Sequence, residues 1–419
     1  MIAGWLFRLK RQVEKLWVTA VLYALLAVAT VGLTRVIGPW VPQGLGSGLD
    51  AAVLESVLTI LASSMLTVTT FSLGIMLTAF STAAASITPR AIELLMRDRT
   101  TQQVLSVFLG AFIFGLVALI AVKAGLYGDR GRLVLFAVTV GVVVLVVMAM
   151  LRWIAHLTRF GRRGDTNDRI ESAAARALQQ RIRAPYLGGH RLAAPPPGDA
   201  VAVLPQATGY VQYVDMGALQ AAAEAAGARV WLDVLPGSFV HPGAPVCRIS
   251  APADVAAFRS AFGIGAARTF EQDPRFGLCV LAEVAERALS PAVNDPGSAI
   301  EILSRVVRLL ADWSEPADPE LLFPSVWVPP LRIEDMFEDV FDPIARDGAG
   351  VFSVQARVQK SLLALVRIDP ARFGRAAVEQ SGRALRRAKA EMLPEDHERL
   401  AGIAAEIAAL AEPRAAPGI

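Results

Sequence analysis

Four long apolar segments constrain the fold of this chain more than any other feature. They cover residues 17–37, 53–85, 104–122 and 133–154 and contain almost no charged residue. A helix needs about 20 apolar residues to cross a hydrocarbon layer of about 30 Å, and buried helices of soluble proteins rarely reach that length without a charge. We therefore predict a membrane α-helical fold, with four transmembrane helices over residues 17–155 and a more polar region after them.

The composition agrees with this division. Of the 419 residues, 54% are hydrophobic and 19% are charged, whereas soluble domains average about 45–50% and about 25%. The two cysteines, Cys247 and Cys279, are too few for a disulfide framework. Most clustered basic residues lie beside the apolar segments, where membrane topology already explains them, so we expect no nucleic-acid partner.

Loop charges predict the orientation in the bilayer. Arg and Lys are concentrated before the first apolar segment, between the second and third, and after the fourth, whereas residues 38–52 contain none. Because cytoplasmic loops carry the excess of Arg and Lys, both termini are expected in the cytoplasm of a multi-pass protein of the bacterial inner membrane. Residues 1–16 form either an interfacial amphipathic helix or a plain extension of the first span.

The second apolar segment carries a stripe of small and hydroxyl side chains. Its members recur every three or four residues, which places them on one face of a helix. We call this face the hydroxyl stripe; the candidate residues are Thr59, Ser63, Thr67, Thr70, Gly74, Thr78 and Ser81.

Three interpretations of the hydroxyl stripe compete. Hydroxyls can bond back to the carbonyl four residues earlier, small residues allow close helix–helix contacts, and polar side chains line water-filled paths. One copy of the stripe cannot enclose a path, so the third interpretation requires a homo-oligomer. No charged residue lies deep in any span, which argues against a proton-coupled transporter or a voltage sensor.

The polar region divides into several predicted parts. We expect a connecting helix and a Pro/Gly-rich linker over residues 156–200, a small β module over 201–252, a helical domain over 253–412 and a flexible tail over 413–419. Helices are predicted over residues 351–367, 370–392 and 395–411. The fold class is therefore a membrane helix bundle joined to a cytoplasmic α+β region.

A glycine-rich run in the β module resembles a known family. Residues 236–246, PGSFVHPGAPV, are similar to the hairpin of biotinyl/lipoyl-type barrel-sandwich domains. That family attaches its cofactor to a lysine, and residues 124–359 of this chain contain no lysine. The resemblance therefore implies a structural or docking module, and we expect no cofactor.

Two neighbouring motifs follow the β module. Residues 268–277 read RTFEQDPRFG and precede a predicted helix over 278–289, and residues 290–296 read SPAVNDP. Asp295 and Pro296 suit the first positions of a second helix that continues to about residue 313. The pair of motifs resembles a bacterial four-span predicted-membrane-protein family of unknown function, which also has a Ser/Thr-rich second span. The resemblance implies the architecture and no activity.

Polar side chains of these motifs form a candidate gate or ligand pocket, with a structural or subunit-contact role as the alternative. The candidate residues are Arg268, Gln272, Asp273, Asn294 and Asp295. We do not expect an enzyme, because the four histidines are scattered and the chain has no serine elbow, phosphate loop or metal-ligand pair.

An acidic helix face lies further along the chain. The predicted helix from Ile333 to Ile344 carries Glu334, Asp335, Glu338 and Asp339 opposite its apolar stripe. This face is a solvated surface, a cation-concentrating vestibule around a symmetry axis, or a partner for the many arginines.

The leading functional interpretation is a homo-oligomeric channel or pore for small ions in the lipid bilayer. The second span would line the path, and the cytoplasmic region would form a vestibule or gate. The alternative is a non-conducting membrane scaffold or sensor that couples to a cytoplasmic partner through the β module.

Overall fold

The computed structural model describes residues 18, 21–26, 28–30, 50–86, 88–90, 99–157, 163–250, 252–314, 316 and 319–412. The chain divides into two compact units, residues 1–165 and residues 166–419. They are called the membrane unit and the C-terminal unit below. The predicted N-terminal helix over 1–16 and the tail over 413–419 lie outside the described residues.

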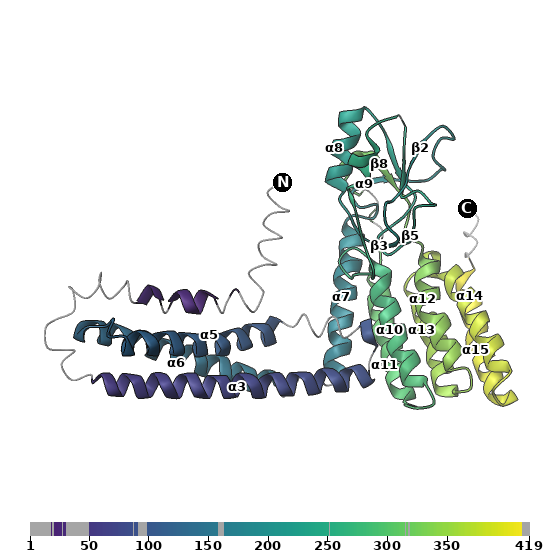
Figure 1. Ribbon diagram of the computed structural model, residues 1–419. Helices are drawn as coiled ribbons and strands as arrows, with labels where there is room; N and C mark the ends of the chain where they lie inside the picture. Colours follow the sequence, from purple (N-terminus) through teal and green to yellow (C-terminus); the bar gives the residue numbers. More distant parts are fainter. Residues whose placement is uncertain are drawn as a thin grey trace. The chain divides into compact units, whose positions relative to one another are not determined.

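Three long helices dominate the described part of the membrane unit. They are α3 (Ala51–Ser86), α5 (Arg99–Lys123) and α6 (Asp129–Leu157), and they lie side by side (Figure 1). Each contains an apolar stretch long enough to cross a membrane, over residues 51–78, 100–123 and 131–157. These stretches correspond to the second, third and fourth predicted spans. The first predicted span, 17–37, lies largely outside the described residues, although residues 21–26 and 28–30 of it are helical.

The membrane unit is held together by a close approach of α3 and α5. Leu54, Leu58, Leu61 and Met65 of α3 recur every three or four residues and pack into the apolar core of this unit. A Cβ added to Gly115 of α5 would lie 3.2 Å from the Ala62 Cβ and 3.3 Å from the Leu58 carbonyl oxygen. The missing side chain of Gly115 therefore lets the two backbones come close, as small residues do between membrane helices.

Helix α6 buries only one narrow face. Leu135, Val142, Val146, Ala149 and Trp153 point into the core at helical spacing. Much of the remaining surface of α6 is apolar and open, with Met148 and Leu151 each 63% exposed. An apolar surface of this extent is typical of a helix that faces lipid.

The C-terminal unit contains two small sheets. The larger has the strand order β1-β8-β4-β6-β2 and the smaller has the order β5-β3-β7. β8 pairs in parallel with β1 and β4, and the other pairings are antiparallel. The strands are β1 (Gly189–Arg191), β2 (Val201–Val203), β3 (Gly209–Val214), β4 (Val230–Leu232), β5 (Phe239–Val240), β6 (Cys247–Ile249), β7 (Phe262–Gly265) and β8 (Phe323–Val328).

The sheets extend beyond the β module predicted over residues 201–252. β1 lies in the segment predicted as a linker, while β7 and β8 lie in the segment predicted as helical. The run that resembles a barrel-sandwich hairpin contains β5 of the smaller sheet and leads directly into β6 of the larger sheet. The barrel-sandwich fold is not confirmed.

Helices form the rest of the C-terminal unit. From α10 to α15 they pack as a bundle beside the sheets, while α7 precedes the first strand and α8 and α9 lie among the strands (Figure 1). The three helices predicted near the C-terminus correspond to α13, α14 and α15. The helices are α7 (Arg163–Arg183), α8 (Met216–Ala226), α9 (Val255–Arg259), α10 (Pro274–Leu289), α11 (Pro296–Ala311), α12 (Ile333–Asp347), α13 (Phe352–Ile368), α14 (Pro370–Lys389) and α15 (Pro394–Ala411).

Candidate functional site

The hydroxyl stripe lies on the exposed face of α3. All of its seven candidate residues are exposed. At 3.6 residues per turn their mean direction lies about 180° from the face that Leu54, Leu58, Leu61 and Met65 bury. The stripe therefore takes no part in packing against α5 and α6, so contacts among the described residues do not explain it.

The hydroxyl groups of the stripe are bonded to their own helix. Thr59 Oγ1 donates to the Glu55 carbonyl at 2.7 Å, Ser63 Oγ to the Thr59 carbonyl at 2.9 Å, and Thr67 Oγ1 to the Ser63 carbonyl at 3.0 Å. Thr70 and Thr78 repeat the pattern at 2.9 and 3.0 Å. Each oxygen still has acceptor capacity, so the stripe tolerates an apolar neighbour and also offers acceptors to water or a cation.

A shallow hollow runs along the middle of the stripe. Thr67, Thr70, Gly74 and Thr78 line it together with larger apolar residues of the same helix. A Cβ added to Gly74 would meet no heavy atom within 4 Å. The outer surface of α3 is thus a small-residue groove, and Leu66 and Phe71 are 48% and 69% exposed beside it.

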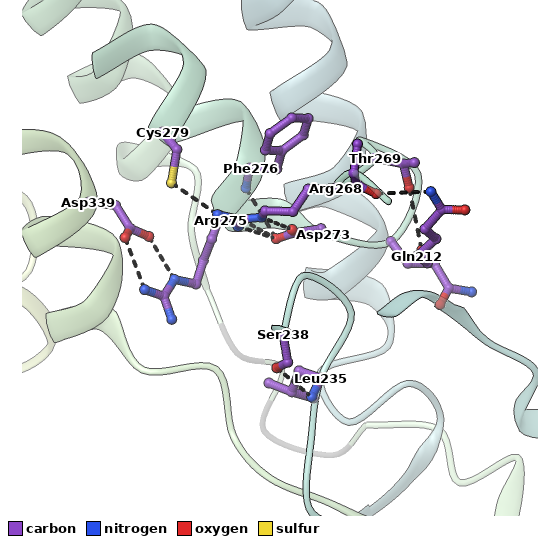
Figure 2. Close-up of polar contacts among 12 residues, drawn as sticks. Gln212, Leu235, Ser238, Arg268, Thr269, Asp273, Arg275, Phe276, Cys279 and Asp339 are labelled. Carbon is purple, nitrogen blue, oxygen red and sulfur yellow. Dashed lines mark hydrogen bonds and ion pairs between the residues drawn. The ribbon is translucent and has the colours of Figure 1, made fainter. Parts of the chain in front are cut away.

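The motif at residues 268–277 builds a buried ion pair at the start of α10. Asp273 is the N-cap of this helix and accepts from the Arg275 and Phe276 amides, each at 3.1 Å. Its carboxylate also accepts from Arg268 Nε at 2.7 Å and from Arg268 Nη2 at 3.1 Å (Figure 2). Helix α10 therefore begins at Pro274, four residues before the predicted start, because Asp273 caps it.

Two residues of the motif, Gln272 and Asp273, also contact the β strands or the turns beside them. Gln272 Oε1 accepts from the Val214 amide of β3 at 2.9 Å. Gly237, in the turn before β5, has a φ of +95°, and a Cβ on it would lie 2.1 Å from Asp273 Oδ2. The glycine-rich run and the RTFEQDPRFG motif, which looked separate in the sequence, thus meet at the Asp273 carboxylate.

The five predicted cluster residues do not form one cluster. Arg268, Gln272 and Asp273 lie at the N-terminal end of α10, whereas Asn294 and Asp295 lie beyond its C-terminal end. The helix has 16 residues, and 16 residues of α-helix span about 24 Å. Asn294 has a φ of +49° in the turn between the helices, and Asp295 caps α11 by accepting from the Ser298 amide at 3.1 Å. A single gate or pocket built from all five is therefore excluded.

The acidic face of α12 is paired with arginines. Arg275 binds Asp339 at 2.6 Å and Asp335 at 3.0 Å, as Figure 2 shows for Asp339. Arg383 binds Glu338 at 3.1 Å, and Arg332 lies 3.9 Å from Glu334. Of the three interpretations, arginine pairing accounts for Asp335, Glu338 and Asp339. The paired arginines reduce the negative charge that this face presents to a cation.

Burial and charge shift the pKa values of Arg268, which pairs with Asp273, and of the neighbouring Cys279. Burial lowers the pKa of Arg268, but the hydrogen bond and charge of Asp273 outweigh it and raise the pKa above the ordinary value. Burial and the nearby Asp339 raise the pKa of the Cys279 thiol to about 11, although Arg268 opposes the rise. Cys279 is therefore a protonated thiol at neutral pH, which is a poor nucleophile.

Sequence reasoning missed two buried arginines. Arg305 of α11 binds Asp168 and Glu171 of α7 and Glu301 of its own helix, each at 2.6 Å. Arg181 lies on the buried face of α7 and is 3% exposed. A signal for Arg181 exists in the sequence, since the buried residues Ile170, Ala174 and Ala177 place it on the apolar face of the helix.

Other sites for chemistry are sparse in the part of the chain that the structure describes. No group of three or more His, Cys, Asp or Glu side chains there is placed to hold a metal ion. The arrangement offers two functional features: an exposed polar groove on a membrane helix, and a buried ion pair that joins α10 to the strands.

Comparisons with known proteins place these features in context. Residues 13–364 match the family described as "Predicted membrane protein (DUF2254)". Uncharacterized proteins of Mycobacterium bovis and Mycobacterium tuberculosis are each 28% identical over 301 residues, which is 66% of this chain and 56% of each relative. The chain thus spans little more than half the length of these relatives. No solved structure matches it.

Proposed function

Because the chain belongs to the DUF2254 family of predicted membrane proteins, we propose that it is a multi-pass protein of the bacterial cytoplasmic membrane whose copies form a channel or pore. Helix α3 lines the path in this proposal, small ions are the conducted species, and no catalytic step is involved. Both termini lie in the cytoplasm, where the C-terminal unit forms a vestibule or gate.

The observation that carries the proposal is the direction of the hydroxyl stripe. Its residues are exposed on the side of α3 opposite the packed face, while Thr69 and Ser72 of the same helix are buried. The oxygens of a polar groove on the outside of a membrane helix can still accept hydrogen bonds, and lipid tails offer none. Copies arranged around an axis place several such grooves toward one another and enclose a path.

The absence of charge inside the spans fits passive conduction. Residues 56–86, 100–122 and 133–151 contain no Asp, Glu, Lys or Arg. Proton relays and voltage sensors use charged side chains within the membrane, whereas hydroxyl and carbonyl oxygens suffice to replace part of the hydration shell of an ion.

Flux through proteoliposomes tests the proposal. The purified full chain is reconstituted, and the movement of K⁺, Na⁺ and Cl⁻ is followed in separate assays. Ser63→Leu is expected to lower the flux at least about tenfold, because it replaces a hydroxyl of the stripe with a larger apolar side chain that offers no acceptor.

Ser64→Leu is the matched control. Ser64 follows Ser63 directly in α3 and is also exposed. Around the helix axis, however, it lies about 90° from the centre of the stripe. Its replacement is expected to leave the flux unchanged. An absence of flux in the wild type for all three ions, or an equal loss in both variants, would contradict the proposal.

A non-conducting scaffold or sensor is the second candidate. The observation in its favour is that the stripe hydroxyls donate to carbonyls of their own helix, so a dry contact between copies leaves no donor unpaired. In that case both leucine variants alter assembly or stability, and neither the wild type nor the variants conduct.

A further inference from the structure

A cavity of about 480 Å³ lies within the C-terminal unit. The C-terminal part of α7 forms one wall, and the junction between β3 and α8 forms another. Arg181, Gln272, Asp215, Met216, Leu187 and Phe323 are among the residues that line it. Pockets for small ligands are typically about 300–1,000 Å³ in volume, so this cavity has room for a compact organic molecule.

Arg181 is the unusual residue of this cavity. Its side chain is almost wholly buried, with 3% of the residue exposed. Its Nη1 has no hydrogen-bond partner among the described residues, and its Nη2 makes only a long contact of 3.4 Å with the Gln272 carbonyl oxygen. Burial lowers the pKa of Arg181 to about 10, although Asp273 opposes the shift. The guanidinium is therefore charged at neutral pH, and its Nη1 lacks a hydrogen-bond acceptor among the described residues, which is costly for a buried cation.

The other walls favour a molecule with one anionic end. Met216 and Gly217, the first residues of α8, lie at the positive end of the helix dipole. Leu187, Met216 and Phe323 supply an apolar wall. Asp215 adds one negative charge at the exposed rim, where its Oδ1 accepts from the Ala218 amide at 2.9 Å. That charge disfavours a second anionic group on the ligand.

We propose that this cavity binds a small organic monoanion, with one carboxylate or phosphate group on a compact apolar body. Arg181 is the counter-ion of the anionic group. The apolar body contacts Leu187, Met216 and Phe323. This binding does not depend on conduction through the membrane unit, so either proposal can fail without the other.

Calorimetric titration of the full chain in detergent tests this site. Benzoate and phenyl phosphate are the probes, and benzamide and phenol are their neutral counterparts. At least one anion is expected to bind the wild type with a Kd below about 1 mM, and its neutral counterpart at least about tenfold more weakly. Arg181→Gln is expected to weaken binding at least about tenfold, and Asp215→Asn to tighten it a few-fold, because the amide oxygen still caps α8.

A second measurement separates ligand binding from a structural role of Arg181. Without ligand, Arg181→Gln is expected to unfold at the same temperature as the wild type or higher, because the variant removes a buried charge that lacks an acceptor. Three results would overturn the proposal: neither anion binds, the anion and its neutral counterpart bind equally, or binding survives in Arg181→Gln. A much lower unfolding temperature of the ligand-free variant would also overturn it, because Arg181 would then be a structural cation.

Discussion

At the scale of single residues, the contact between Gly237 and Asp273 tightly restricts what can replace this glycine. Gly237 has a φ of +95°, and its position leaves no room for a Cβ beside the carboxylate that Arg268 holds. Gly237→Ala is therefore expected to lower the free energy of unfolding by about 2 kcal/mol or more. Urea unfolding of the full chain in detergent, followed by tryptophan fluorescence, measures the change.

Gly227→Ala is the control for backbone strain alone. Gly227 has a φ of +59° as the C-cap of α8, but a Cβ there would meet no heavy atom within 4 Å. Gly227→Ala is expected to lower the free energy of unfolding by about 1 kcal/mol or less. An equal decrease in the free energy of unfolding of the two variants would show that the contact with Asp273 does not add to the effect of backbone strain.

The Cys279 thiol makes stability depend on alkaline pH. Its pKa is about 11 in the folded protein, compared with about 8.5 for an ordinary thiol, because burial and Asp339 disfavour the thiolate. The folded state holds this proton more tightly than the unfolded chain does. The resulting stability is complete below about pH 8.5 and is lost as the pH rises toward about 11, by about 1–3 kcal/mol in total.

Cys279→Ser removes the titrating group and serves as the comparison. The difference in unfolding free energy between the wild type and this variant is expected to shrink steadily over that pH range, because serine does not titrate there. Other groups titrate equally in both proteins and cancel in the difference. A constant difference across the range would contradict the shifted pKa.

The sequence predicts the roles of residues whose partners are close in the chain better than those whose partners are distant. The role of Asp295 as a cap was predicted correctly, because a cap and its helix are neighbours in the chain. The contact between Gly237 and Asp273 was not predictable, since the two lie far apart in sequence and meet only when β strands and α10 pack. The same holds for Asn294 and Asp295, which the length of α10 separates from the other candidate residues.

At the scale of elements, the approach of α3 to α5 governs the membrane unit. Gly115→Leu is expected to push these helices apart, because its Cβ position already lies within 3.4 Å of Ala62 and Leu58. Overpacking of this kind costs about 1–3 kcal/mol. The measurement is the SDS concentration at which the helical circular dichroism of the detergent-solubilised protein is half lost, and we expect a decrease.

Gly141→Leu is the matched variant on α6. A Cβ at Gly141 would meet no heavy atom within 4 Å, so the leucine reaches toward lipid or detergent. Its replacement is expected to leave the SDS midpoint unchanged or raise it slightly, because leucine favours the helix more than glycine does. A larger decrease for Gly141→Leu than for Gly115→Leu would contradict the described packing.

Elements differ in how well the sequence predicts them. Three of the four predicted long apolar helices and the helices near the C-terminus were predicted within a few residues, because their apolar residues give a clear signal in length or period. The sheets were harder, since β8 pairs with β1 and β4 from more than 90 residues earlier. Register between such short, distant strands is set by packing and leaves little local pattern.

At the scale of the whole molecule, the chain divides into two units because one part of the sequence is apolar enough for lipid and the other is polar. The sequence changes from apolar to polar near residue 156, and the units divide after residue 165. Which way α3 faces could not be predicted, since the spacing alone allows its hydroxyls to face either α5 or the outside. One apolar face of α3, with Leu54, Leu58, Leu61 and Met65, is buried in the core of the membrane unit, and the hydroxyl stripe lies on the opposite face.

We propose that the hydroxyl stripe faces water in the assembled protein. The direct test is to react single cysteines on α3 with a charged, membrane-impermeant thiosulfonate, in a chain whose two native cysteines are replaced by serine. Ser63→Cys and Gly74→Cys lie on the stripe, and Ser64→Cys and Leu73→Cys are their sequence neighbours off it. Thiosulfonates react with the thiolate, which forms readily only in contact with water.

In reconstituted membranes, we expect the two stripe cysteines to react at least about tenfold faster than their neighbours, because only they line the path. Slow reaction at all four positions would contradict it, since the stripe would then face lipid or a dry contact between copies.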